Sequence, residues 1–64
     1  MPLVQISILE GRPVEKVKKL IGEVTDTVAE TLEVPKERVR VIVSEVPKTH
    51  WGIAGTPASE TPGR

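Results

Sequence analysis

The sequence predicts an α/β (α+β) fold: a single βαβ unit with parallel strands, followed by a short C-terminal hairpin. Three observations predict it. Residues 3–9 and 39–46 are rich in β-branched residues, which is typical of strands. Residues 14–33 carry apolar side chains at spacings of three and four, which is typical of a helix. Because a strand–helix–strand connection crosses over right-handed, the two strands should run parallel.

Residues 3–9 (LVQISIL) form the first predicted strand. Alternation divides its side chains between two faces, with Val4, Ile6 and Ile8 on one and Leu3, Gln5, Ser7 and Leu9 on the other. The second face is only partly polar, so we expect it to be covered too. Gly11 is free to take a turn conformation, and Pro13 suits the first turn of a helix.

The helix predicted over residues 14–33 has one apolar stripe. Its members are Val14, Val17, Leu20, Ile21, Val24, Val28 and Leu32. Pro35 is expected to stop this helix, because the residue before a proline is displaced from helical geometry.

The second predicted strand covers residues 39–46. Arg40 shares one face with Ile42 and Val46, where a charged side chain needs a partner or a ligand. Downstream, the glycines and the single aromatic residue, Trp51, predict a loop with a short hairpin. Residues 1–64 thus form a single domain, with a flexible polar tail at 60–64.

The composition excludes several classes of protein. Nine basic and nine acidic side chains give zero net charge, which argues against a nucleic-acid partner. Without cysteine and with one histidine, neither a disulfide scaffold nor a metal cluster is expected. No apolar run approaches a membrane span, and the N-terminus lacks a basic signal-peptide region. We therefore expect a soluble, cytoplasmic domain without cofactor or metal.

The length and the strand pattern both predict self-association. A chain this short buries only about 60% of its unfolded surface, and no disulfide or metal is available to compensate. One helix can cover only one face of the two-stranded sheet. The opposite apolar face and two free strand edges would remain exposed unless other copies of the chain cover them.

Pro2 is the residue that most clearly indicates a chemical role. Removal of Met1 would leave Pro2 with a free secondary amine, and an unperturbed α-amino group has a pKa near ~7.7–8.0. Burial and nearby positive charge both lower such a pKa, so the amine could act as a general base at neutral pH. Arginines near it would also bind an anionic substrate through bidentate hydrogen bonds.

Several segments together resemble the 4-oxalocrotonate tautomerase family, part of the tautomerase superfamily with an N-terminal proline. They are Pro2, the strand 3–9, ILEGR at 8–12, VRVI at 39–42 and HWGI at 50–53. The resemblance covers all but the last few residues. A proline at position 2 alone would be weak evidence, but the combined spacing is specific.

The resemblance implies roles for four residues. Pro2 matches the catalytic base, and Arg12 matches the arginine that holds the distal carboxylate of the substrate. Arg40 matches an arginine from a neighbouring subunit that contacts the 2-oxo group and stabilises the developing dienolate. Trp51 matches an aromatic residue, usually Phe, that forms the pocket wall. The family assembles as a homohexamer, a trimer of dimers, and each site is completed across subunit interfaces.

The sequence departs from the family pattern at three places. Pro13 stands where relatives often have Ser, Trp51 replaces Phe, and the tail 60–64 lacks a basic ending. Arg38, one alternation before Arg40, is an alternative to it and ranks lower. We interpret His50 as a surface or interface residue.

The expected activity is ketonisation of 2-hydroxymuconate, or of a close dicarboxylate 2-oxo acid relative, in aromatic-ring catabolism. One alternative is a haloacrylate dehalogenase of the same superfamily, which needs a carboxylate to activate water; none lies near Trp51 in the sequence. The other is a self-assembling binding module without activity.

Overall fold

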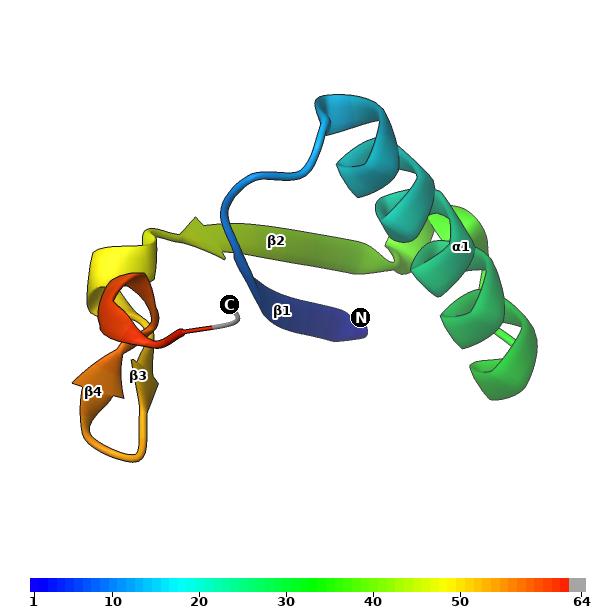
Figure 1. The fold of residues 1–64 in the computed structure, drawn as a ribbon. Helices are drawn as coiled ribbons and strands as arrows, with labels where there is room; N and C mark the ends of the chain where they lie inside the picture. Colours follow the sequence, from blue (N-terminus) through cyan, green and yellow to red (C-terminus); the bar gives the residue numbers. More distant parts are fainter. Residues whose placement is uncertain (63–64) are drawn as a thin grey trace.

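The computed structural model describes residues 1–62 and confirms the predicted fold class (Figure 1). Its strands and helix are β1 (Leu3–Leu9), α1 (Val14–Leu32), β2 (Arg40–Val46), β3 (Gly52–Ile53) and β4 (Thr56–Pro57). Three short 3₁₀ turns complete the chain: η1 (Lys36–Arg38), η2 (Lys48–His50) and η3 (Ala58–Glu60).

Strands β1 and β2 pair in parallel, as predicted, with a register that runs from Leu3↔Arg40 to Leu9↔Val46. One further backbone bond extends the ladder at each end. The Arg40 N–H donates to the Pro2 carbonyl at 3.0 Å, and the Glu10 N–H donates to the Val46 carbonyl at 3.0 Å. The ladder therefore fixes the residues that flank β1 as well as the strand itself.

Helix α1 begins at the predicted residue and ends one residue early. Glu33, the predicted last residue, has left-handed backbone angles (φ 57°, ψ 49°), and its N–H donates to the Ala29 carbonyl. A left-handed residue closes a helix by returning its N–H to a free carbonyl of the last turn. The helix thus ends at this residue, before the restriction imposed by Pro35 takes effect.

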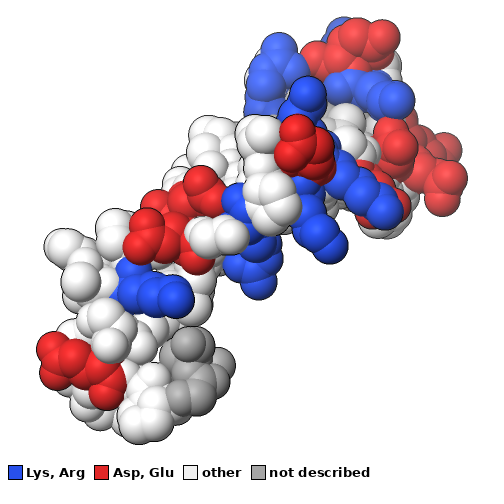
Figure 2. Space-filling view, turned by 45° about the horizontal axis from the view of Figure 1, so that its top comes forward, with Lys and Arg blue, Asp and Glu red and all other residues white. Residues whose placement is uncertain are grey.

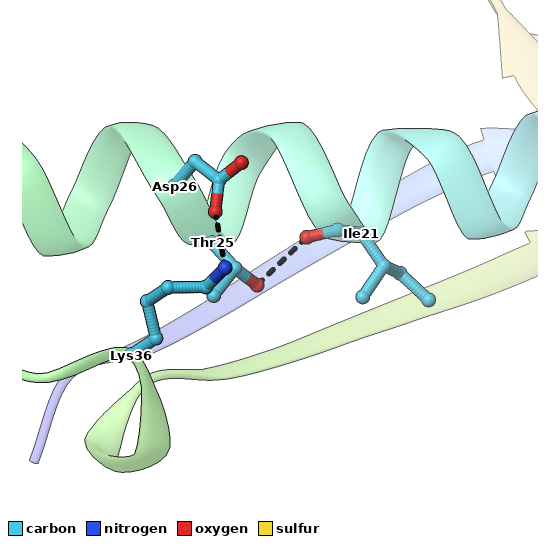
Figure 3. Close-up of polar contacts among 4 residues, drawn as sticks. All are labelled: Ile21, Thr25, Asp26 and Lys36. Atoms are coloured by element: carbon cyan, nitrogen blue, oxygen red, sulfur yellow. Dashed lines mark hydrogen bonds and ion pairs between the residues drawn. The ribbon is translucent and has the colours of Figure 1, made fainter.

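Strand β2 begins at Arg40, one residue later than predicted, because Val39 closes η1 and donates its N–H to the Lys36 carbonyl at 3.0 Å. An ion pair between Lys36 Nζ and Asp26 Oδ1, at 3.1 Å, connects η1 to α1 (Figure 3). Both side chains are largely exposed, so this pair stabilises the fold by less than about 1 kcal/mol.

The predicted hairpin is formed by β3 and β4, which pair antiparallel. Its two turn residues, Ala54 and Gly55, both have positive φ (52° and 87°), as two-residue hairpin turns commonly require. The Ala58 N–H donates to the Trp51 carbonyl at 2.7 Å, and Ala58 is buried. Together with η2 and η3, the hairpin forms a C-terminal unit at the opposite end of β2 from α1 (Figure 1).

The predicted flexible tail, residues 60–64, starts at the last residue of η3. Thr61 follows η3 and makes two bonds: its hydroxyl donates to the Pro57 carbonyl at 3.0 Å, and its N–H donates to the Ala58 carbonyl at 3.1 Å. Residues 63–64 lie outside the described residues.

The protomer is too extended to enclose a core of its own. Its radius of gyration is 14.8 Å, whereas a compact chain of this length would have about 11 Å. Its accessible surface is 4972 Å², about 900 Å² more than a compact monomer of this mass. That excess is close to the roughly 800 Å² that one partner buries in a standard interface. Of residues 1–62, only three are buried, namely Ala29, Val39 and Ala58.

The two faces of the sheet differ as the alternation predicts. The side chains of Val4, Ile6, Val41 and Val43 are half-buried on the face that carries α1. On the opposite face Leu3 and Ile42 are 54% and 48% exposed. Charges of both signs are interspersed over much of one side of the molecule, with uncharged surface between them (Figure 2). Within residues 1–62, α1 is not apolar enough to cross a membrane, and no other helix is long enough.

Candidate active site

Pro2 and Arg40 meet at the end of the sheet where β1 and β2 begin. The Arg40 N–H donates to the Pro2 carbonyl at 3.0 Å, which fixes the Pro2 main chain directly before β1. Pro2 is half-buried, whereas Met1 is 83% exposed. We call this region, with Arg38, the proline end. Removal of Met1 would leave the anchoring bond intact, because that bond uses the Pro2 carbonyl and not its nitrogen.

The Arg40 side chain folds onto the turn that precedes its own strand. Its Nη1 donates to the Glu37 carbonyl at 2.7 Å and to the Val39 carbonyl at 3.2 Å. These carbonyls partner only one of the guanidinium nitrogens, and a guanidinium offers five N–H donors in all. Arg40 is exposed and shares its sheet face with Ile42. It is thus held in place and still able to bind an anion.

Arg12 lies at the other end of β1. Its Nη1 donates to the Leu9 carbonyl at 3.2 Å, across a turn in which Gly11 has φ 120°. This φ is the turn conformation that the sequence predicts for Gly11, and few other residues adopt it. The seven residues of β1, about 23 Å of extended chain, lie between Pro2 and Arg12. A single protomer therefore does not bring these two predicted site residues together.

Trp51 belongs to the same end of the sheet as Arg12. It follows η2, which continues from the end of β2, and it is half-buried. We call this region, with Glu10, the hairpin end. The four predicted residues thus form two pairs, Pro2 with Arg40 and Arg12 with Trp51, at opposite ends of one sheet.

Glu10 is a further residue of the hairpin end; it lies within the ILEGR segment at 8–12, but no role was predicted for it from the sequence. Its Oε1 accepts a hydrogen bond from the Lys48 N–H at 3.4 Å, although the two residues are 38 positions apart. His50 is exposed, and its Nδ1 lies 2.7 Å from the hydroxyl of Thr49. This position agrees with the interpretation of His50 as a surface residue.

Comparison with known proteins identifies the family. Residues 2–60 match the model of the tautomerase enzyme family. The chain is also 52% identical over 60 residues to a 2-hydroxymuconate tautomerase of Pseudomonas putida, a match that covers 94% of this chain and 95% of that one. The chain belongs to the tautomerase family. The resemblance stated from the sequence is thereby confirmed, and the protein is an enzyme of the isomerase class.

Solved structures of 4-oxalocrotonate tautomerases share the fold of this tautomerase. An isozyme of Methylibium petroleiphilum has a TM-score of 0.89 and 43% identity, covering 98% of this chain and 100% of that one. A heterohexameric 4-oxalocrotonate tautomerase of Chloroflexus aurantiacus has a TM-score of 0.89 and 38% identity, covering 94% and 97%. The Chloroflexus aurantiacus relative is thus a hexamer, in agreement with the extended shape of this protomer.

Proposed function

We propose that this tautomerase ketonises 2-hydroxymuconate, or a closely related dienol, to an unsaturated 2-oxo dicarboxylic acid, with Pro2 as the general base. The observation that carries the proposal is the contact between Pro2 and Arg40. The contact joins main-chain atoms: it fixes Pro2, which gains a free amine once Met1 is removed, at the end of the sheet where the Arg40 guanidinium keeps free donors. The name of the Pseudomonas putida relative supports the substrate.

The proposed reaction needs one base and one place for negative charge. The free amine of Pro2 accepts the proton of the 2-hydroxyl group and then delivers a proton to a conjugated carbon, so no atom is gained or lost. Negative charge collects on the oxygen during this transfer. A guanidinium that binds this oxygen more strongly in the transition state than in the substrate accelerates the reaction. An Arg40 supplied by a neighbouring protomer takes this role in the proposal, as the resemblance to the family implies.

Arg12 and Trp51 bind the rest of the substrate in the proposal. The Arg12 guanidinium pairs with the distal carboxylate, a charge-assisted contact worth roughly 1.5–3 kcal/mol. Trp51 forms an apolar wall along the hydrocarbon chain, and this wall favours the neutral form of the amine. Because β1, about 23 Å of extended chain, lies between Pro2 and Arg12 in one protomer, the proposal requires that another copy supply Arg12.

The proposed assembly is a homohexamer, a trimer of dimers, in which the proline end of one protomer meets the hairpin end of another. The exposed Leu3 and Ile42 and the excess surface of the protomer support such contacts. The proposed setting is aromatic-ring catabolism in the cytoplasm.

The test compares two forms of the N-terminus. Intact mass establishes whether Met1 has been removed, and absorbance follows the conversion of 2-hydroxymuconate. The Met1-free enzyme should be active, and its kcat/KM should rise with pH as the amine loses its proton. A form with an additional residue ahead of Pro2 should assemble normally and be inactive, because an amide nitrogen is not basic. Full activity of this extended form would contradict the proposal.

A further inference from the structure

Glu10 forms the side-chain connection between the turn that carries Arg12 and the C-terminal unit that carries Trp51. Its N–H donates to the Val46 carbonyl at 3.0 Å, and its Oε1 accepts the Lys48 N–H at 3.4 Å. Glu10 thus binds the chain on both sides of Pro47, a residue that has no N–H to donate. Within residues 1–62, the Glu10 carboxylate is the only hydrogen-bond partner of the Lys48 N–H.

This contact fixes the path of the chain that leads to Trp51. Pro47 is rigid and extended (φ −60°, ψ 147°), and it gives η2 no side-chain cap. Within η2 the His50 N–H donates to the Pro47 carbonyl at 2.9 Å, and Trp51 follows immediately. A bond at the first residue of such a short turn therefore orients the residue that comes directly after the turn.

The same contact fixes the chain that leads to Arg12. Arg12 lies two residues after Glu10 and binds the Leu9 carbonyl, one residue before Glu10. Gly11, between them, has φ 120° and contributes no side chain to the turn. The Glu10 carboxylate thus joins the segment that leads to Arg12, two residues further along, to the segment that leads to Trp51, three residues after Lys48.

We propose that Glu10 is a positioning residue that holds Arg12 and Trp51 at a fixed separation, so that one substrate molecule meets both. The roles of Arg12 and Trp51 rest on the proposed function, whereas the attachment itself rests on the described contacts. Glu10 and Lys48 are exposed, so the contact adds little to the free energy of unfolding. Its effect is on alignment, and small misplacements of binding groups lower activity strongly.

Trp51 provides a direct readout, because it is the only tryptophan and the chain has no Tyr or Phe. In the assembled Met1-free enzyme, Glu10→Ala should shift the Trp51 emission to longer wavelength and lower its anisotropy. It should also lower kcat/KM by roughly tenfold, mostly through KM. Glu10→Gln keeps an oxygen acceptor and should restore both properties. Glu45→Ala is the matched control, since it removes the same charge near the same end of the sheet.

The proposal would be overturned if Glu10→Ala kept the emission, anisotropy and KM of the wild type. It would also be overturned if the Glu45→Ala control changed these properties as much as Glu10→Ala does. If Glu10→Ala does not fold, amide hydrogen exchange of the wild type decides. The Lys48 amide should exchange more slowly than that of Thr49, which has no backbone hydrogen bond in residues 1–62. Equal exchange rates at the two amides would show that the Glu10 carboxylate does not hold the Lys48 N–H.

These outcomes are separate from those of the proposed function. A wild type that does not convert 2-hydroxymuconate would refute the proposed function, and the emission and exchange measurements would still decide on Glu10. Conversely, normal turnover by the wild type with unaltered emission in Glu10→Ala would refute only the role of Glu10.

Discussion

The proline end and the hairpin end of the sheet are built in different ways. At the proline end, the main-chain bond from Arg40 to Pro2 continues the regular ladder, and main-chain carbonyls of the preceding residues hold the Arg40 side chain. The hairpin end has a matching ladder bond, from the Glu10 N–H to the Val46 carbonyl, but the further connection to η2 depends on the side chain of Glu10. Backbone ladders tolerate substitution of side chains, whereas a side-chain contact does not. We thus propose that proton transfer takes place at the proline end, which main-chain bonds hold, and that the hairpin end, which depends on a side-chain contact, selects the substrate.

The largest effect is expected at Pro2. Pro2→Ala leaves the carbonyl that accepts the Arg40 N–H in place, so the assembly should be preserved. It replaces a secondary amine with a primary amine of different basicity and geometry, and kcat should fall by roughly 10²–10⁴-fold. Absorbance assays with 2-hydroxymuconate give the rate, and light scattering gives the assembly. Unchanged turnover would show that Pro2 is not the base and that the reaction does not take place at the proline end.

The next effect distinguishes the two arginines at the proline end. Arg40→Ala removes the donors proposed to stabilise the developing oxyanion, and kcat should fall by roughly 10²–10³-fold. Arg38→Ala removes the same charge from η1, two residues away, and should change kcat little. Steady-state kinetics of both variants provide the comparison. A larger loss in Arg38→Ala would transfer the role to Arg38, the alternative indicated by the sequence.

A smaller effect, of a different kind, is expected at the hairpin end. Arg12→Ala removes a contact with the distal carboxylate that is worth roughly 1.5–3 kcal/mol, so kcat/KM should fall by about 10- to 100-fold. The loss should appear mainly in KM, because this carboxylate does not react. Substrate titrations separate the two constants. A loss confined to kcat would show that Arg12 acts in the chemical step, contrary to its proposed role in substrate binding.

Mixing experiments sharpen the same comparison. Because each site is proposed to combine the ends of different protomers, Pro2→Ala and Arg12→Ala chains that are unfolded together and refolded should form some sites with both residues intact. The mixture should therefore exceed the summed activity of the separate variants. Additive activity would place both residues of each site in one chain, contrary to their separation along β1.

Residue patterns predicted most of the fold because its elements are long and periodic. The alternation in β1 and the helical spacing in α1 follow from burial of one face, and the structure reproduces both. The ends of elements were less predictable. Glu33 closes α1 in a left-handed conformation that its residue type does not favour, and Val39 closes η1 before it can join β2.

The residues of the candidate site were proposed from the sequence, whereas the contacts between its segments were not. Pro2 stood out through its chemistry and Arg40 through its place on a strand face, whereas the resemblance to the family supplied the roles of Arg12 and Trp51. The length of β1 separates Pro2 from Arg12. The bond between Glu10 and Lys48 joins positions 38 residues apart and follows no periodicity. Such a contact depends on where two loops meet in space, which a linear pattern does not encode.

The bond that anchors Pro2 by its carbonyl has a consequence for the proposed base. A histidine or lysine that serves as a base must have its side-chain torsions immobilised, at an entropic cost. In proline the reactive nitrogen belongs to the main chain and to a closed ring, so no χ rotation moves it independently of the backbone. Once the first strand has paired, the proposed base therefore has no side-chain torsion left to order before it accepts a proton.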